Sequence, residues 1–198
     1  MDAKKGALLV RIAREAIESH VKSGNARPKR PANVPPEFSA KSGVFVTLHT
    51  YPEKELRGCI GYPEPVMPLM EALLESAVHA CHDPRFPPLS KGELAHVIVE
   101  VSVLTPPVPI RVKSPEEYPG KIKIGRDGLI IEKGYSRGLL LPQVPVEWNW
   151  DAHEFLENLC HKAGLPGGAW KREGVKILSF RSEIFAEEKP GGPAGKSG

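Results

Sequence analysis

The sequence has 198 residues, a formal net charge of +3 and 40% hydrophobic residues, which suits one domain or two small subdomains sharing a core. It contains no apolar run near the 18 residues of a membrane helix, and its first residues alternate charged with apolar side chains, so neither a membrane span nor a signal peptide is predicted. The cations are scattered, so a solvated charged surface is favoured over a nucleic-acid-binding face. Three widely spaced cysteines argue against a secreted disulfide framework and indicate a cytoplasmic protein.

The first half of the chain is predicted to form a helix, a hairpin of two strands and a second helix. Apolar residues recur at helical spacing over 9–21, and Gly24 is the expected stop. Residues 27–42 are rich in proline and are predicted to form an extended surface loop. The segments GVFVTLHT (43–50) and LRGCIGY (56–62) are predicted to pair as a hairpin. A second helix is predicted from Pro68 to His82.

The second half is predicted to be mainly strands with one helix. The most strand-like run is LAHVIVEVSVL, residues 94–104. Asp127-Gly128 predicts a hairpin turn between KIKIG and LIIEKG, and 137–148 is expected to add a strand. Asp151 and Glu154 form a capping box that predicts a third helix over 151–163. A final strand is expected over 175–188.

These elements predict an α+β fold with a mainly antiparallel sheet and flanking helices. The ordered domain is expected over 5–187, and the proline- and glycine-rich tail over 188–198 is predicted to be disordered. The chain has 21 prolines, one glutamine and four asparagines. Rigid loops and few thermolabile amides are typical of a thermophilic source.

Metal binding and several common catalytic motifs are not supported by the sequence. The pairs Cys81-His82 and Cys160-His161 lack chelating spacing, and both cysteines fall on apolar helix faces. No phosphate-binding loop or serine nucleophile elbow is present. The sequence therefore predicts neither a metal site nor a cofactor.

The strand LRGCIGY carries the strongest candidate chemistry. Alternation places Arg57 and Cys59 on one face of the strand and its leucine and isoleucine on the other. A neighbouring guanidinium favours the thiolate and lowers the pKa of a cysteine. Gly58 and Gly61 leave the backbone bare, which allows a ligand to approach closely, and equally allows a bulge or tight packing against a helix.

Other charged residues are expected to complete a site near Cys59. Glu100 lies in the middle of a strand and needs a cation if its face is covered, which Arg57 or Arg85 could supply. Arg57 is predicted to pair with Glu100 or Asp83. The loop DPRFPPL (83–89) is expected to form part of the wall of a cleft. A general base for Cys59 would come from Glu100, His79 or His82.

Six ordered motifs reveal a resemblance: LRGCIGYPEP, DPRFPPLS, VEVSVLTPP, GLIIEKG, RGLLLPQVPVEW and FLENLCHKAGL. Over roughly residues 5–187 the chain resembles the AMMECR family, whose signature is LRGCIG. The resemblance implies two closely packed subdomains of unequal size, with both chain ends in the larger one and the signature lining the cleft. It also implies an occurrence in archaea, bacteria and eukaryotes. In prokaryotes the family is often encoded beside, or fused to, a Memo-like protein and a radical-SAM protein, so Memo-like or radical-SAM partners are expected.

Two functional hypotheses remain open. The first is a binding or accessory module that presents the cleft to a small ligand, a partner protein or, less favoured, a nucleic acid. The alternative is an enzyme, for example in nucleic-acid modification, with Cys59 as nucleophile or substrate-contacting thiol and Arg57 holding an anionic group. The binding residues expected in either case are Arg57, Gly58, Gly61, Asp83, Arg85 and Glu100. The module is preferred because no acid or base is placed beside the thiol by the sequence.

Overall fold

The computed structural model describes residues 1–24, 28 and 31–197. The chain forms two compact units, which are described separately below: unit 1 comprises Met1–Leu104 and Glu183–Gly198, and unit 2 comprises Thr105–Ser182. Both chain ends belong to unit 1. Residues 25–26, and residues 27, 29 and 30 of the predicted proline-rich loop, lie outside the described residues.

Unit 1 is built on a five-stranded sheet with the order β2-β1-β3-β8-β9. Strand β1 pairs antiparallel with both β2 and β3, and β8 pairs antiparallel with β9. The elements of unit 1 are α1 (Ala3–Ser23), a 3-10 turn (Pro36–Ser39), β1 (Val44–Thr50), β2 (Leu56–Tyr62), α2 (Leu69–Ala80), a 3-10 turn (Lys91–Ala95), β3 (Val97–Leu104), β8 (Ser182–Glu187) and β9 (Ala194–Lys196). The predicted hairpin of residues 43–50 and 56–62 is confirmed.

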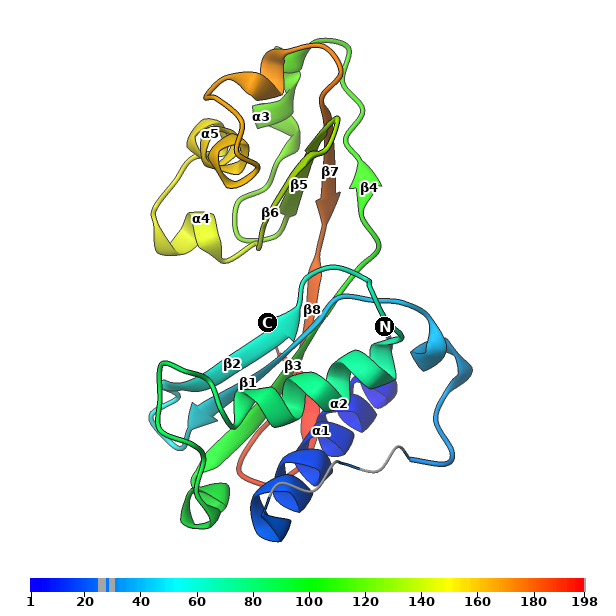
Figure 1. Ribbon diagram of the computed structural model, residues 1–198, viewed down its shortest axis with the longest axis vertical. Coiled ribbons are helices and arrows are strands. Elements are labelled where there is room, and N and C mark those ends of the chain that lie inside the picture. Colours follow the sequence, from blue (N-terminus) through cyan, green and yellow to red (C-terminus); the bar gives the residue numbers. More distant parts are fainter. Residues whose placement is uncertain (25–27, 29–30, 198) are drawn as a thin grey trace. The chain divides into compact units, whose positions relative to one another are not determined.

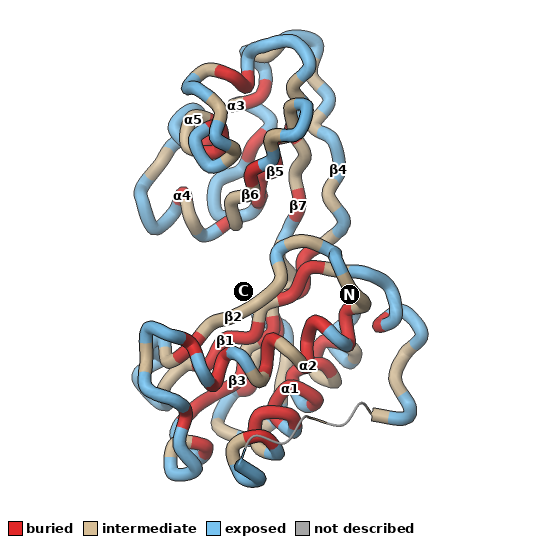
Figure 2. Tube along the Cα trace, in the orientation of Figure 1, coloured by how far each residue is buried: buried red, intermediate tan, exposed pale blue. Residues whose placement is uncertain are grey.

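Helices α1 and α2 cover one face of this sheet (Figure 1). Alternate β1 residues Val44, Val46 and Leu48 are fully buried in the core formed with the two helices, and the buried positions follow the helix–sheet interface in Figure 2. Helix α1 begins earlier than predicted, because Asp2 caps it by accepting from the Lys5 amide. It ends at Gly24, whose φ of 70° is left-handed, as the sequence predicts. The opposite face of β1 is therefore the one not covered by these helices.

The predicted disorder of the tail is wrong for the residues that the structure describes. Residues 194–196 form β9, in which Gly195 pairs with Ala186 of β8. Ala194 packs against the core of unit 1. The small residues that seemed to offer nothing to bury instead add a strand at the sheet edge, where backbone hydrogen bonds need no large side chain.

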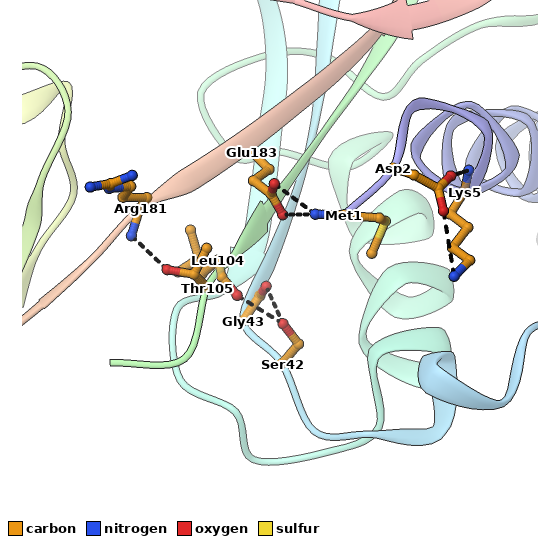
Figure 3. Close-up of polar contacts among 9 residues, drawn as sticks. All are labelled: Met1, Asp2, Lys5, Ser42, Gly43, Leu104, Thr105, Arg181 and Glu183. Carbon is orange, nitrogen blue, oxygen red and sulfur yellow. Dashed lines mark hydrogen bonds and ion pairs between the residues drawn. The ribbon is translucent and has the colours of Figure 1, made fainter. Parts of the chain in front are cut away.

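The chain passes between the units twice, at 104–105 and 182–183. The two passing segments are hydrogen-bonded, because Thr105 N–H donates to the Arg181 carbonyl at 2.9 Å. Arg181 N–H in turn donates to Thr105 Oγ1 at 2.9 Å (Figure 3). The single strand predicted over 175–188 is therefore wrong. It divides at Arg181 into β7 (Lys176–Phe180) of one sheet and β8 of the other.

Unit 2 contains a four-stranded antiparallel sheet with the order β4-β7-β5-β6. Helix α5 begins at the predicted capping box of Asp151 and Glu154, and its buried side includes Phe155, which shares a core with Trp170. The remaining elements are β4 (Val108–Pro109), a 3-10 turn (Pro115–Glu117), α3 (Tyr118–Lys121), β5 (Gly128–Lys133), β6 (Ser136–Leu140), α4 (Val144–Glu147), α5 (Ala152–Lys162) and a 3-10 turn (Ala169–Lys171).

The hairpin predicted around Asp127-Gly128 is wrong. Asp127 is buried and accepts from the Lys123 amide at 2.9 Å and from the Arg126 guanidinium, so it organises the loop before β5. The observed hairpin joins β5 to β6 through Gly134, whose φ is 57°. The strand predicted over 137–148 stops at Leu140, and α4 follows. The α+β class with antiparallel sheets is nevertheless confirmed.

Within residues 1–24, 28 and 31–197, no helix has both the length and the apolar character needed to cross a membrane.

Candidate functional site

The strand that carries LRGCIGY is an edge strand with a break in its register. Leu48 pairs with Gly58, but His49 pairs with Leu56, so Arg57 is an extra residue opposite the β1 strand. The bulge places Leu56 on the side of His49 and leaves it 40% exposed. The predicted alternation, with Leu56 on the core side and Arg57 beside Cys59, is therefore wrong at these two residues.

Both signature glycines lie where the protein itself occupies the space of a side chain. A Cβ on Gly58 would lie 2.4 Å from the carbonyl oxygen of Ala80 at the end of α2. A Cβ on Gly61 would lie 2.3 Å from the Val44 carbonyl oxygen and 2.5 Å from the Phe45 ring. The glycines thus allow close packing within unit 1, on the helix side at Gly58 and on the other side at Gly61.

Four polar side chains line up on the sheet face that α1 and α2 do not cover. Thr47 is paired in register with Cys59 on one side and with Glu100 on the other. The Thr47 hydroxyl donates to Cys59 Sγ at 3.2 Å. The Nε2 atom of His49, two residues along β1, lies 3.8 Å from a Glu100 carboxylate oxygen. We call Cys59, Thr47, Glu100 and His49 the polar row.

The polar row contains two groups, His49 and Glu100, that lack a full set of hydrogen-bond partners within the described residues. Burial raises the pKa of the Glu100 carboxyl, against the opposing effect of His49. The Nδ1 atom of His49 is buried and makes no hydrogen bond within the described residues. Buried polar atoms are normally hydrogen-bonded, so such an atom marks a strained, hydrated or ligand-binding position.

The lowered thiol pKa that the sequence predicts for Cys59 is not found. Burial raises the pKa of its thiol, although the Thr47 hydrogen bond and the Arg85 charge both lower it. Burial also raises the pKa of Cys160, and that of Cys81 rises to about 12. Cys81 and Cys160 are buried, whereas Cys59 is partly exposed. Cys59 is therefore the accessible thiol but not an intrinsically activated one.

Asp83 and Arg85 bind the backbone of Cys59 along the outer edge of β2. Asp83 Oδ2 accepts from the Cys59 N–H at 2.8 Å, and Arg85 Nη2 lies 3.4 Å from the Cys59 carbonyl oxygen. The two side chains also form a bidentate pair, with distances of 3.0 and 2.6 Å. The Arg85 hydrogen bonds hold the pKa of buried Asp83 far below its usual range. The pair occupies the place of a neighbouring strand at this edge.

Arg57 binds neither of its predicted partners. Its Nε donates to Glu93 at 2.7 Å, and its Nη2 donates to the Pro87 carbonyl at 2.9 Å. The Arg57 hydrogen bond lowers the pKa of Glu93 to about 2. Phe86 lies between these contacts and those of Arg85, with both guanidinium carbons within 6 Å of its ring centroid. Residues 83–89 thus contact the signature strand, and their expected role as part of the wall of a cleft stays a prediction.

The histidines considered as bases for Cys59 lie elsewhere. His82 Nε2 is 2.8 Å from His20 Nε2 at the end of α1, and His79 is exposed on α2. Of the predicted bases, only Glu100 lies in the polar row. In the described part of the chain, no three histidine, cysteine or acidic side chains gather in a group that could hold a metal ion.

Comparison with known proteins gives the family. The AMMECR1 family model matches residues 10–185. The chain belongs to the AMMECR1 family. It is 55% identical over 190 residues to Protein MJ0810 of Methanocaldococcus jannaschii, covering 96% of this chain and 93% of that protein. It is also 55% identical over 192 residues to Protein PH0010 of Pyrococcus horikoshii, covering 95% and 92%.

A solved structure supports the same assignment. The crystal structure of uncharacterized protein PH0010 from Pyrococcus horikoshii matches with a TM-score of 0.79 and 51% identity, covering 100% of this chain and 98% of that one. Both organisms are thermophilic archaea, in agreement with the source indicated by the composition.

Sequence reasoning missed three residues around the AMMECR1 signature: Thr47, His49 and Glu93. Thr47 and His49 alternate with Val46 and Leu48, so they could have been assigned to the face opposite the core. Glu93 could not be found this way, because it reaches Arg57 from a 3-10 turn 36 residues later. Its signal was the capping box with Ser90, which fixes the glutamate at the start of that turn.

Proposed function

We propose that this AMMECR1-family protein is a binding or accessory module that recognises a small polar ligand at the polar row. The observation that carries the proposal is the in-register placement of Cys59, Thr47 and Glu100 on three neighbouring strands, with His49 beside the carboxyl group. A hydroxyl, a carboxyl and an imidazole offer both donors and acceptors. The incomplete pairing of His49 and Glu100 supports a role in contacting another molecule.

A ligand would gain from this arrangement in two ways. The three strands fix the backbone positions of the row, which lowers the entropy that is lost when a ligand is held. Each half-buried polar group that acquires a partner also removes part of a desolvation cost. The signature glycines support this role indirectly, since they let α2 and Phe45 pack around the strand.

The test is a thermal-shift screen of polar metabolites against the wild-type protein and Glu100→Gln. Compounds that bind the polar row should raise the melting temperature of the wild-type protein and lose most of that effect with Glu100→Gln. Glu15→Gln is the control, because Glu15 is exposed on α1. Hits that stabilise all three proteins equally would contradict the proposal.

A thiol enzyme is the second candidate, and the presence of Glu100 in the same row as Cys59 favours it. The raised pKa of the thiol opposes it, since the thiolate is the nucleophile. If the enzyme reading is correct, incubation with activated esters should acylate Cys59, and intact-mass measurement should show a thioester that turns over. A row that only binds should leave Cys59 without an acyl group in peptide mapping, whatever acylation occurs at lysine side chains.

A further inference from the structure

Arg85 is the most exposed charged group held rigidly beside the signature strand. Its side chain is 56% exposed, whereas that of its partner Asp83 is 1% exposed. Nε and Nη2 donate to the two Asp83 oxygens, and Nη2 also reaches the Cys59 carbonyl. The guanidinium carbon lies 5.7 Å from the centroid of the Phe86 ring. An exposed arginine is usually free to rotate, but this one is fixed on three sides.

Some N–H donors of Arg85 make no hydrogen bond within the described residues. A guanidinium has five N–H donors, and those of Nε and Nη2 face Asp83 and Cys59. The Nη1 group makes no hydrogen bond or ion pair within the described residues. Arg57 uses the same two nitrogens, since its Nε faces Glu93 and its Nη2 faces the Pro87 carbonyl, but its side chain is only 12% exposed. The role of anion binding that the sequence assigned to Arg57 therefore fits Arg85 better.

Arg85 is also close enough to act on Cys59. It lies against the carbonyl group of that residue, and its positive charge favours the thiolate form of the thiol. A molecule bound to the free Nη1 donors would therefore lie at the edge of β2, next to the accessible thiol. Buried Asp83 holds the guanidinium in place by accepting hydrogen bonds from Nε and Nη2, which leaves Nη1 for a ligand.

We propose that Arg85 is the anion-binding group of this site and that the ligand is a small carboxylate or phosphate whose remaining part reaches Cys59. This inference rests on the proposed function, since it names the chemical class of the ligand. Carboxylate and phosphate oxygens both accept charge-assisted hydrogen bonds from guanidinium N–H donors such as those of Nη1. Because Asp83 offsets the net charge of Arg85, recognition comes from directed N–H donors rather than from a general positive field.

Two alkylating reagents of nearly equal size test the inference. Iodoacetate carries a carboxylate, and iodoacetamide is its neutral analogue; in each case the Cys59 thiolate displaces iodide and forms a carbon–sulfur bond. In the wild-type protein, the iodoacetate-to-iodoacetamide rate ratio at Cys59 should exceed that of the denatured chain by roughly three- to tenfold. Inorganic phosphate or acetate, at constant ionic strength, should slow the iodoacetate reaction.

Substitutions assign the effect to Arg85. The ratio should fall to the denatured value with Arg85→Gln, whose amide can still donate to Asp83, and should be intermediate with Arg85→Lys. Arg11→Gln, on the exposed side of α1, should keep the wild-type ratio. Buried Cys81 and Cys160 should stay unlabelled in each folded variant, which checks the fold.

The outcomes separate this inference from the proposed function. A rate ratio that is equal in the wild-type protein and Arg85→Gln overturns the anion-binding role while leaving the polar row accessible. Phosphate and acetate that slow both reagents equally would also overturn it. If native Cys59 reacts with neither reagent, the polar row admits no ligand, and the proposed function fails together with the inference.

Discussion

The carboxylate of Asp83 accepts a 2.8 Å hydrogen bond from the backbone N–H of Cys59, so the turn after α2 holds the outer edge of the signature strand. Asp83 is buried, and Arg85 covers it from the solvent side. The turn therefore does two things: it protects a strand edge from pairing with another chain, and it fixes the residue that carries the accessible thiol.

Replacing Asp83 with Asn should destabilise unit 1 by about 1–3 kcal/mol at pH 7, because charge-assisted hydrogen bonds to Arg85 and Cys59 are lost. The folded pKa of Asp83 is lowered, so its contribution is complete above the unfolded pKa of about 3.9 and is lost as the pH falls toward the folded pKa. Urea unfolding at several pH values should show the difference from wild type shrinking below about pH 4. A difference that stays constant to pH 2 would contradict this, and Glu15→Gln should match wild type throughout.

Replacing Gly58 with Ala should also destabilise the protein, by about 1–3 kcal/mol, because the new methyl group would lie 2.4 Å from the Ala80 carbonyl oxygen. Gly92→Ala is the matched control, since nothing lies within 4 Å of its Cβ position. Chemical denaturation of both variants measures the effect. Equal stability of Gly58→Ala and Gly92→Ala would show that α2 does not pack against the strand as described.

Deleting residues 189–198 should lower the melting temperature by several degrees, because the deletion removes β9 and its pairing with β8. The loss also uncovers the part of the core against which Ala194 packs. The Lys196→Gln variant keeps the backbone pairing and should melt like the wild-type protein. An unchanged melting temperature after the deletion would mean that β9 contributes no stability.

Arg14→Met should be the most destabilising of these changes, by about 3–5 kcal/mol, because it leaves the buried Glu187 carboxylate without its cation. Arg14 also donates to the Val97 carbonyl at 2.6 Å, and Glu187 accepts from the Val99 N–H at 2.9 Å. The double variant Arg14→Met, Glu187→Leu should recover only part of the loss, since these two backbone groups then lack partners. Full recovery in urea unfolding would show that the backbone contacts add little.

Local chemistry explains which parts of the fold were predictable. The capping box of Asp151 and the stop at Gly24 depend on neighbouring residues, and both were found from the sequence. The hairpin expected at Asp127-Gly128 failed because the aspartate is buried and binds Arg126 and the Lys123 amide instead of closing a turn. A common turn dipeptide says nothing about whether its side chain will be buried.

The candidate site was only partly predictable for a related reason. The expected cleft wall of residues 83–89 stays a prediction, and Arg57 was paired with the wrong carboxylates. Its partner depends on the bulge opposite Leu48, and the bulge depends on how closely the end of α2 approaches Gly58. Such tertiary packing leaves no periodic pattern in the sequence.

The insertion of unit 2 between β3 and β8 has a consequence for how the protein is made on the ribosome. Arg14 is synthesised 173 residues before Glu187, so at 5–20 residues per second it lacks its buried partner for roughly 9–35 s. All of residues 105–182 are synthesised in that interval. Unit 2 therefore has its whole sequence available first, and the unit that begins the chain is the last to be completed.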